Sequence, residues 1–238
     1  MKTPDHARRD ADSVREMFAR VAPRYDRINR AMCFGLDSLW RRRAARAAVE
    51  GCAGGLPVLD LACGSGDIAL ELLKAGPSGG VCACDLCAEM LAVAASKIGA
   101  AGFSAETVRA DAENLPFADA SFGACTIGFG FRNFADRPKC LREIARVLAP
   151  GGGLFILEVA RARPLFEPVQ NFFMGCVVPS IAAALGGDRG DYRYLARTTR
   201  DFPRRAELEA MLGECGFARV STEPYAFGFV ALTKAFKK

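Results

Sequence analysis

Apolar and polar residues follow one another along this chain in blocks that predict strands and helices in turn. Short runs typical of strands occupy residues 56–63, 79–86, 104–111, 120–131 and 153–160. Apolar residues at helical spacing lie between these runs, at 66–76, 88–100 and 137–150. Because parallel strands need a long crossover connection, this order predicts an α/β fold with a doubly wound, mostly parallel sheet.

The two ends of the chain depart from this alternation. Helical spacing predicts two helices before the first strand, at 12–22 and 38–51. A helix at 205–216 and strands at 217–227 and 227–237 close the chain. The last two strands leave no room for a crossover helix, so we expect them to run antiparallel.

Positive charge is concentrated in the first part of the chain. Residues 1–46 contain 12 Lys or Arg and 6 Asp or Glu, which gives +6, whereas the whole chain carries +5. Such a segment can bind nucleic acid or an anionic membrane surface, or it can be a solvated helix face. No zinc finger or other nucleic-acid motif accompanies it, and aromatic residues are not interleaved with the arginines. We therefore expect no nucleic-acid partner.

The cysteines and the single histidine limit which metal sites and catalytic groups the chain can form. The chain has ten cysteines, but its first residues lack the apolar stretch of a signal peptide, so we expect a cytoplasmic protein with reduced thiols. Cys82, Cys84 and Cys87 have no fourth ligand at a zinc-site spacing, and we expect no metal site. The single histidine, His6, lies in a polar tail, which excludes a histidine-based triad from the core.

A glycine-rich turn follows the first strand of the α/β region. Residues 64–69 satisfy the dinucleotide pattern G-x-G-x-x-G/A, and Asp85 lies where a dehydrogenase places its ribose-binding acid. Asp60, four residues before Gly64, argues for a different ligand. Its carboxylate would repel a pyrophosphate and attract the ammonium and sulfonium groups of S-adenosylmethionine. The helix that begins after Gly66 could receive the carboxylate of the same ligand.

Further positions complete this predicted cofactor site. Asp85 can accept hydrogen bonds from both ribose hydroxyls, and Asp111, at the end of the third predicted strand, can accept from an adenine amino group. Ala112 offers a backbone donor and an apolar contact to the ring. Asp60 and Asp111 could instead cap turns. Together, these residues predict a class I methyltransferase that uses S-adenosylmethionine, ahead of a nicotinamide-dependent oxidoreductase.

Nearly the whole chain resembles the ubiquinone/menaquinone biosynthesis C-methyltransferases. The resemblance rests on the blocks FARVAPRYDRINRAMCFGLDSLWRR, LDLACGSGD, DAENLPFADASF, GFGFRNFADRPKCLREIARVLAPGG, LEVARAR, YRYLARTTRDFP and AFGFVALTKAFK, in this order. The glycine loop and the P-G-G turn occur in many methyltransferases, whereas the Y-D-x-x-N, F-G-x-R-N and Y-x-Y-L blocks are more specific. The resemblance implies a Rossmann-like sheet of seven strands with an antiparallel last strand.

The resemblance also implies a division of the chain. A helical segment, residues 1–50, is expected to fold over the active site of a methyltransferase domain, residues 51–238. Within that domain, residues 160–200 are expected to form a helical lid over a lipid substrate. Their apolar run at 172–187 is interrupted by Pro179 and is too short to cross a membrane. Additional helices packed in the core are the alternative.

Cofactor contacts carry over to this chain by position. The resemblance assigns them to Ser65, Asp85, Asp111 and Ala112. Relatives commonly have a serine at the position of Gly128, where this chain retains only a backbone contact. The expected cofactor residues are therefore Asp60, Gly64, Ser65, Gly66, Asp85, Asp111, Ala112 and Gly128.

The reaction that the resemblance implies is methyl transfer to a ring carbon of a polyprenylated quinol. A carbon ortho to a hydroxyl becomes nucleophilic when that hydroxyl, with a pKa of about 10, ionises. Arg132 and Asn133 follow the fourth strand at the edge where α/β sheets bind ligands, and we expect them to hold the two quinol oxygens. An arginine paired with an acid and an asparagine that shapes the turn are the alternative. Tyr25 is expected to pack against substrate or cofactor, and Asp26 to orient Arg132 or to cap a helix.

The substrate would reside in a membrane, and the basic N-terminal segment could bind to that membrane. We expect it to dock peripherally on the anionic inner face of the membrane. The expected product is a menaquinol formed from a demethylmenaquinol, with a ubiquinone precursor as a further acceptor. A sterol or tocopherol-like acceptor is the main alternative, and a nucleic-acid-binding methyltransferase is another. The sequence leaves open whether the chain forms a homodimer.

Overall fold

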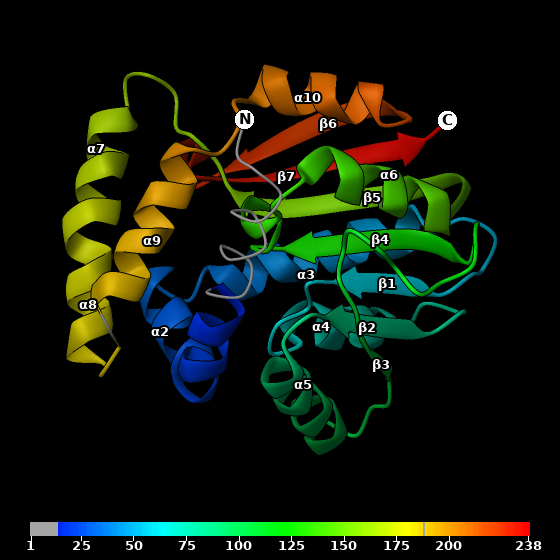
Figure 1. The fold of residues 1–238 in the computed structure, drawn as a ribbon, viewed down its shortest axis with the longest axis horizontal. Helices are drawn as coiled ribbons and strands as arrows, with labels where there is room; N and C mark the ends of the chain where they lie inside the picture. Colours follow the sequence, from blue (N-terminus) through cyan, green and yellow to red (C-terminus); the bar gives the residue numbers. More distant parts are fainter. Residues whose placement is uncertain (1–13, 188) are drawn as a thin grey trace.

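A twisted sheet of seven strands forms the middle layer of the computed structural model, which describes residues 14–187 and 189–238 (Figure 1). The strands are β1 (Val58–Leu61), β2 (Val81–Asp85), β3 (Glu106–Arg109), β4 (Phe122–Gly128), β5 (Leu148–Val159), β6 (Phe217–Tyr225) and β7 (Val230–Lys237). Their order is β3-β2-β1-β4-β5-β7-β6, and β7 runs antiparallel to both of its neighbours. The strands from β1 to β5 pair in parallel. The predicted fold class is thus confirmed.

Helices cover both faces of this sheet. One face carries α3 (Asp37–Glu50), α4 (Asp67–Ala75) and α5 (Ala88–Ala100), and the other carries α6 (Arg137–Val147) and α10 (Arg205–Glu214). Buried residues of β1 alternate between the two layers: Val58 packs with α3 and α4, and Leu59 packs with α6 and α10. The two apolar layers fix the strand ends from which the site is built.

A separate group of helices lies at the carboxyl ends of the parallel strands, on the left of Figure 1. It consists of a helical stretch at residues 14–21, η1 (Ala22–Arg24), α2 (Tyr25–Met32), α7 (Glu167–Phe172), the π-helix η3 (Phe173–Val177), α8 (Val178–Ala184) and α9 (Arg189–Arg200). Ile28 and Met32 of α2 pack against Met174, Val178 and Ala182, which joins the N-terminal helices to the segment after β5. Within the described part of the chain, no helix is both long and apolar enough to span a bilayer.

Two local features differ from the sequence prediction. The spacing did not predict α2 or α9 as helices, although both form. The turn expected at residues 150–153 interrupts β5 rather than preceding it, because the partner of β4 changes from Leu148 to Gly153. The intervening residues bulge out of the ladder, with Gly151 at a φ of 75°. Short 3-10 turns follow β4 at η2 (Phe131–Asn133) and β6 at η4 (Ala226–Gly228).

Candidate active site

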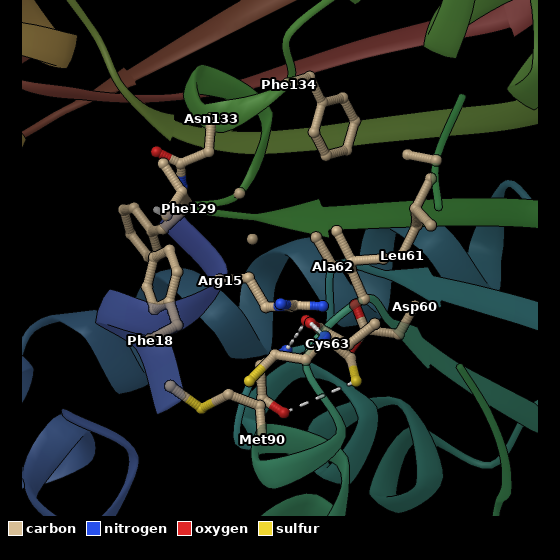
Figure 2. Close-up of a pocket in the computed structure, with 18 of the residues that line it drawn as sticks. Arg15, Phe18, Asp60, Leu61, Ala62, Cys63, Met90, Phe129, Asn133 and Phe134 are labelled. Carbon is tan, nitrogen blue, oxygen red and sulfur yellow. Dashed lines mark hydrogen bonds between the residues drawn. The ribbon is translucent and has the colours of Figure 1, made fainter. Parts of the chain in front are cut away.

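A pocket lies at the carboxyl ends of β1, β2 and β4, where the strand order reverses (Figure 2). This is the position at which open α/β sheets bind ligands. Its wall combines the N-terminal helices, the glycine loop and the loops after β2, β3 and β4; among its residues are Arg15, Phe18, Tyr25, Asp60, Ala62, Cys63, Gly64, Ser65, Asp85, Met90, Asp111, Ala112, Gly128, Phe129, Asn133 and Phe134. Most of the residues predicted to bind the cofactor thus meet in one place.

The glycine loop is held in shape by the carboxylate of Asp85, the last residue of β2. Asp85 Oδ2 accepts from the backbone amide of Gly64 at 2.8 Å, and its Oδ1 accepts from the amide of Cys87 at 2.8 Å. Burial raises the pKa of Asp85, although both amides favour its ionised form. Each oxygen retains a lone pair, so the carboxylate can still accept from ribose hydroxyls.

Close packing leaves no space for a side chain at two of the predicted glycines, Gly66 and Gly128. Gly66 does not line the pocket; it has a φ of 81°, and a Cβ there would lie 2.8 Å from the Cβ of Ala94 and 3.1 Å from its Cα. A Cβ on Gly128 would lie 2.2 Å from Cδ1 of Ile68. Ile68 therefore fills the space that a serine side chain would need at position 128.

Asp60 tests whether the site fits a cationic ligand. The residue is 1% exposed, and its Oδ1 accepts from the Thr126 hydroxyl at 2.8 Å. Its Oδ2 is buried and has no hydrogen-bond partner among the described residues. Burial raises the pKa of Asp60 to about 7, although the Thr126 hydroxyl favours the ionised form. A buried carboxylate oxygen of this kind calls for a donor, and the ammonium of S-adenosylmethionine is a suitable one.

Arg132 lies behind the pocket wall. Its Nη1 donates to Glu158 Oε1 at 2.6 Å and to the carbonyl of Phe129 at 2.5 Å, and its backbone amide donates to Glu158 Oε2 at 3.0 Å. The side chains of Arg132 and Glu158 are 8% and 3% exposed, and Arg132 is not among the described residues that line the pocket. The arrangement is the alternative foreseen from the sequence, an arginine paired with an acid. Glu158 was missed, although a lone acid within an apolar strand was the available signal.

Asn133 and Tyr25 do face the pocket. Asn133 Oδ1 accepts from the Tyr194 hydroxyl at 3.1 Å, which ties α9 to the loop after β4. Burial raises the pKa of Tyr25, although nearby Arg132 and Arg41 oppose the shift, so its phenol stays protonated at neutral pH. Tyr194 was not recognised beforehand, although it belongs to the Y-x-Y-L block.

Asp26 does not orient Arg132 as expected. Its Oδ1 accepts from the Ser65 hydroxyl at 2.5 Å, and its Oδ2 is paired with Lys97. The hydroxyl of Ser65, itself 3% exposed, is therefore used within the protein. Only the spatial arrangement reveals this link, because the partners lie 39 and 71 residues apart in the chain.

This chain is similar to known proteins in sequence and in fold. The ubiE/COQ5 methyltransferase family matches residues 6–237. The demethylmenaquinone methyltransferase of Thermus thermophilus is 43% identical, over 91% of this chain and 97% of the relative. The enzyme of the same name from Deinococcus radiodurans is 41% identical, over 92% and 90%. The ubiquinone/menaquinone biosynthesis C-methyltransferase UbiE of Cronobacter sakazakii is 38% identical, over 95% and 91%.

A solved structure extends the likeness to the fold. The crystal structure of a SAM-dependent methyltransferase from Thermotoga maritima, described as a possible histamine N-methyltransferase, has a TM-score of 0.64 at 20% identity. The match covers 94% of this chain and 99% of that one. At this identity the likeness concerns the fold alone.

Proposed function

Because this chain belongs to the ubiE/COQ5 methyltransferase family, we propose that it methylates a ring carbon of a polyprenylated quinol, with S-adenosylmethionine as the methyl donor. The favoured acceptor is a demethylmenaquinol, which becomes a menaquinol. Two relatives named for demethylmenaquinone share 43% and 41% identity, whereas relatives named for both quinones, such as those from Cronobacter sakazakii and Haemophilus ducreyi, share 38% and 36%. The observation that carries the proposal is the buried, unpartnered oxygen of Asp60 inside the pocket.

Residues that line the pocket could bind each part of the cofactor. S-adenosylmethionine would supply an electrophilic methyl group carried on a sulfonium. Asp60 would accept from its ammonium, Asp85 would accept from the ribose hydroxyls, and Asp111 with the backbone of Ala112 would hold the adenine. Gly64 has a φ of 53°, and the space where a Cβ would lie is open, with no protein atom within 4 Å. A ligand could therefore approach the backbone closely at this residue.

The acceptor would be bound on the side formed by Asn133 and Tyr25. Asn133 can hydrogen-bond one quinol oxygen, and Tyr25, which stays protonated, can donate to the other. The apolar side chains of Phe18, Phe129 and Phe134 border this region and would exclude water from the ring (Figure 2). Orientation of the two reactants would then supply a large part of the rate.

Arg132 has a positioning role in this proposal. Its charge is offset by Glu158 at 2.6 Å, and its bond to the carbonyl of Phe129 fixes the turn that presents Asn133. A buried arginine with two such partners holds one loop conformation rather than moving onto a substrate. Arg132 thus acts on the acceptor through Asn133.

A methyl-transfer assay tests the proposal. The purified protein is given S-adenosylmethionine and either a reduced short-chain demethylmenaquinone or a reduced methoxy-benzoquinone. We expect methylation of the naphthoquinol, lost in Asp60→Asn and retained in Asp119→Asn, whose side chain is 79% exposed. Cofactor binding without methylation of either quinol would refute the substrate. Preference for the benzoquinol would overturn the assignment to menaquinone.

We also propose that α7 and the turn before it, in the segment after β5, dock on an anionic membrane that contains the substrate. Val169 and Phe172 of α7 are 57% and 64% exposed, and Leu165, in the turn just before this helix, is 81% exposed. Phe227, 80% exposed, extends this apolar surface from the turn after β6, where its ring contacts the start of α7. Arg163, two residues before Leu165, is exposed. The basic excess of residues 1–46 would add to the attraction of the protein for an anionic surface. An exposed apolar surface with an arginine beside it is the composition expected of an interfacial surface.

Vesicle flotation tests this surface. The protein should float with vesicles of phosphatidylglycerol and phosphatidylcholine but not with phosphatidylcholine alone, because both charge and apolar contact contribute. A Leu165→Ser/Phe172→Ser variant should lose binding, whereas Phe103→Ser, at a 38% exposed residue after α5, should retain it. Equal flotation of all three proteins would contradict the assignment of the surface.

A further inference from the structure

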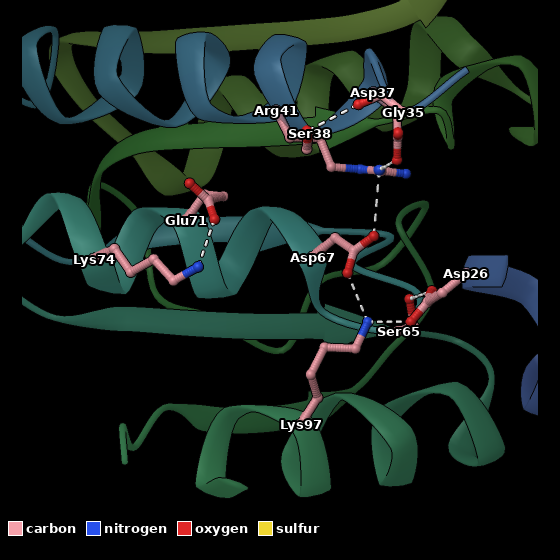
Figure 3. Close-up of polar contacts among 10 residues, drawn as sticks. All are labelled: Asp26, Gly35, Asp37, Ser38, Arg41, Ser65, Asp67, Glu71, Lys74 and Lys97. Carbon is pink, nitrogen blue, oxygen red and sulfur yellow. Dashed lines mark hydrogen bonds and ion pairs between the residues drawn. The ribbon is translucent and has the colours of Figure 1, made fainter. Parts of the chain in front are cut away.

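The N-terminal segment is joined to the rest of the protein by charged side chains (Figure 3). Asp26, in the first turn of α2, accepts from the Ser65 hydroxyl at 2.5 Å and is paired with Lys97 of α5. The Nζ of Lys97 also lies 2.6 Å from Oδ1 of Asp67, the first residue of α4. One ammonium group therefore bridges a carboxylate of the covering segment and a carboxylate of the helix that follows the glycine loop.

The bridge continues into the pocket wall. Oδ2 of Asp67 lies 3.3 Å from Nη1 of Arg41, and Arg41 forms a buried pair with Asp37 one turn earlier on α3. Asp67 and Arg41 line the cofactor pocket, whereas Lys97 is not among the described residues that do so. Lys97 thus lies outside the pocket but is connected to its wall.

We propose that Lys97 is a positioning residue for cofactor binding, which holds residues 14–32 closed over the pocket by bridging Asp26 and Asp67. Both carboxylates contact the same nitrogen, so without the ammonium they would face each other and repel. On the side of α5 the apolar contacts of the segment centre on Ala22, which packs with Cys87 and Met90. Ile28 and Met32 hold the other side of the segment, so the bridge acts in addition to these apolar contacts. The proposal rests on the proposed cofactor.

The bridge lies at a position where it can form and break as residues 14–32 move. Arg15 and Phe18 of the covering segment line the pocket, so a movement of this segment would open one wall of it to ligand. The side chains of Lys97 and Asp26 are 23% and 37% exposed, so water can replace the ion pair without disturbing the core. The bridge is therefore a contact that can break when the segment opens, and its loss favours the open form.

Hydrogen–deuterium exchange of the cofactor-free protein and a cofactor titration test this role. In Lys97→Met, amides of residues 14–32 should exchange faster, and the Kd for S-adenosylmethionine should rise by about tenfold, because a charge-assisted contact to the closed form is lost. Lys97→Arg should restore both values. Lys74→Met is the matched control, since Lys74 pairs with Glu71 at 2.7 Å on α4 and is not an ion-pair partner of Asp26 among the described residues.

A second variant separates the bridge from a general loss of stability. Adding Asp26→Asn to Lys97→Met removes the repulsion, while the amide oxygen can still accept from Ser65, so part of the affinity should return. Unchanged exchange and affinity in Lys97→Met, or an equal loss in Lys74→Met, would overturn the proposal. The exchange measurement needs no quinol, so a wrong acceptor would leave this result intact.

Discussion

Replacing Asp60 by asparagine should stabilise the cofactor-free protein at pH 8 and abolish cofactor binding. Asp60 is 1% exposed, and burial raises its pKa from 3.8 to about 7. Because the folded-state pKa lies above the unfolded value, the folded protein holds the additional proton between these two values. The free energy of unfolding therefore falls as the pH rises through this window, and the loss is complete above pH 7.

The size of this effect follows from the shift. A change from 3.8 to about 7 is about 3 pKa units, and at 1.36 kcal/mol per unit the ionised carboxylate costs about 4 kcal/mol of stability by pH 8. About 2–3 kcal/mol of this loss falls between pH 5 and pH 8. Asparagine can keep the bond from Thr126 and carries no charge. The advantage of Asp60→Asn over the wild type should thus grow by that amount across this range, or by about 5–10 °C in Tm.

Urea unfolding at pH 5, 6, 7 and 8 measures this advantage, with Asp119→Asn as the exposed control. Calorimetric titration with S-adenosylmethionine at pH 8 measures the loss of binding. In the wild type, affinity should also fall below pH 7, because protons compete with the ammonium for Asp60. A stability difference independent of pH, or full cofactor affinity in Asp60→Asn, would refute the reasoning.

Three further substitutions probe the rest of the site. Glu158→Gln leaves Arg132 buried without its partner, so urea unfolding should show a loss of about 3–5 kcal/mol, and an unchanged midpoint would contradict the buried pair. Tyr194→Phe removes the bond to Asn133, so the KM for the quinol should rise several-fold while thermal stability changes little; an altered KM for the cofactor instead would place Tyr194 elsewhere. Gly66→Ala meets both a φ of 81° and the backbone of α5, so it should cost about 2–4 kcal/mol in urea unfolding and weaken cofactor binding. Wild-type stability in that variant would show that the loop can shift.

Local patterns in the sequence determined the sheet, its flanking helices and most of the residues of the proposed cofactor site. Strands β1, β2 and β4 are short apolar runs, and their carboxyl ends are fixed by where those runs stop. Asp60 and Asp85 lie at or near the ends of β1 and β2, and Asp111 follows the more polar β3, so the alternation of strands and helices places all three at one edge of the sheet. The glycine turn adds a backbone conformation that few other residues adopt, as the φ of Gly66 shows.

The covering helices could not be predicted in the same way. The spacing of Tyr25, Ile28 and Met32 along α2 is helical, but the segment is short and mostly polar, so an isolated helix of this length is marginal. It forms because Ile28 and Met32 are buried against Met174 and Val178, almost 150 residues further along the chain. Tertiary packing, rather than helix propensity, decides this element.

Only the tertiary structure decided which charged groups are paired. Arg132 and Glu158 are 26 residues apart, and Asp26 and Lys97 are 71 apart, yet each pair forms a contact. Periodicity and motif spacing describe neighbours along the chain and contain no information on such distant partners. Folding brings them together because apolar packing fixes the backbones, and the burial of Arg132 and Glu158 then favours their pairing. The sequence therefore identified the residue types of the site, and the packing of the chain assigned their roles.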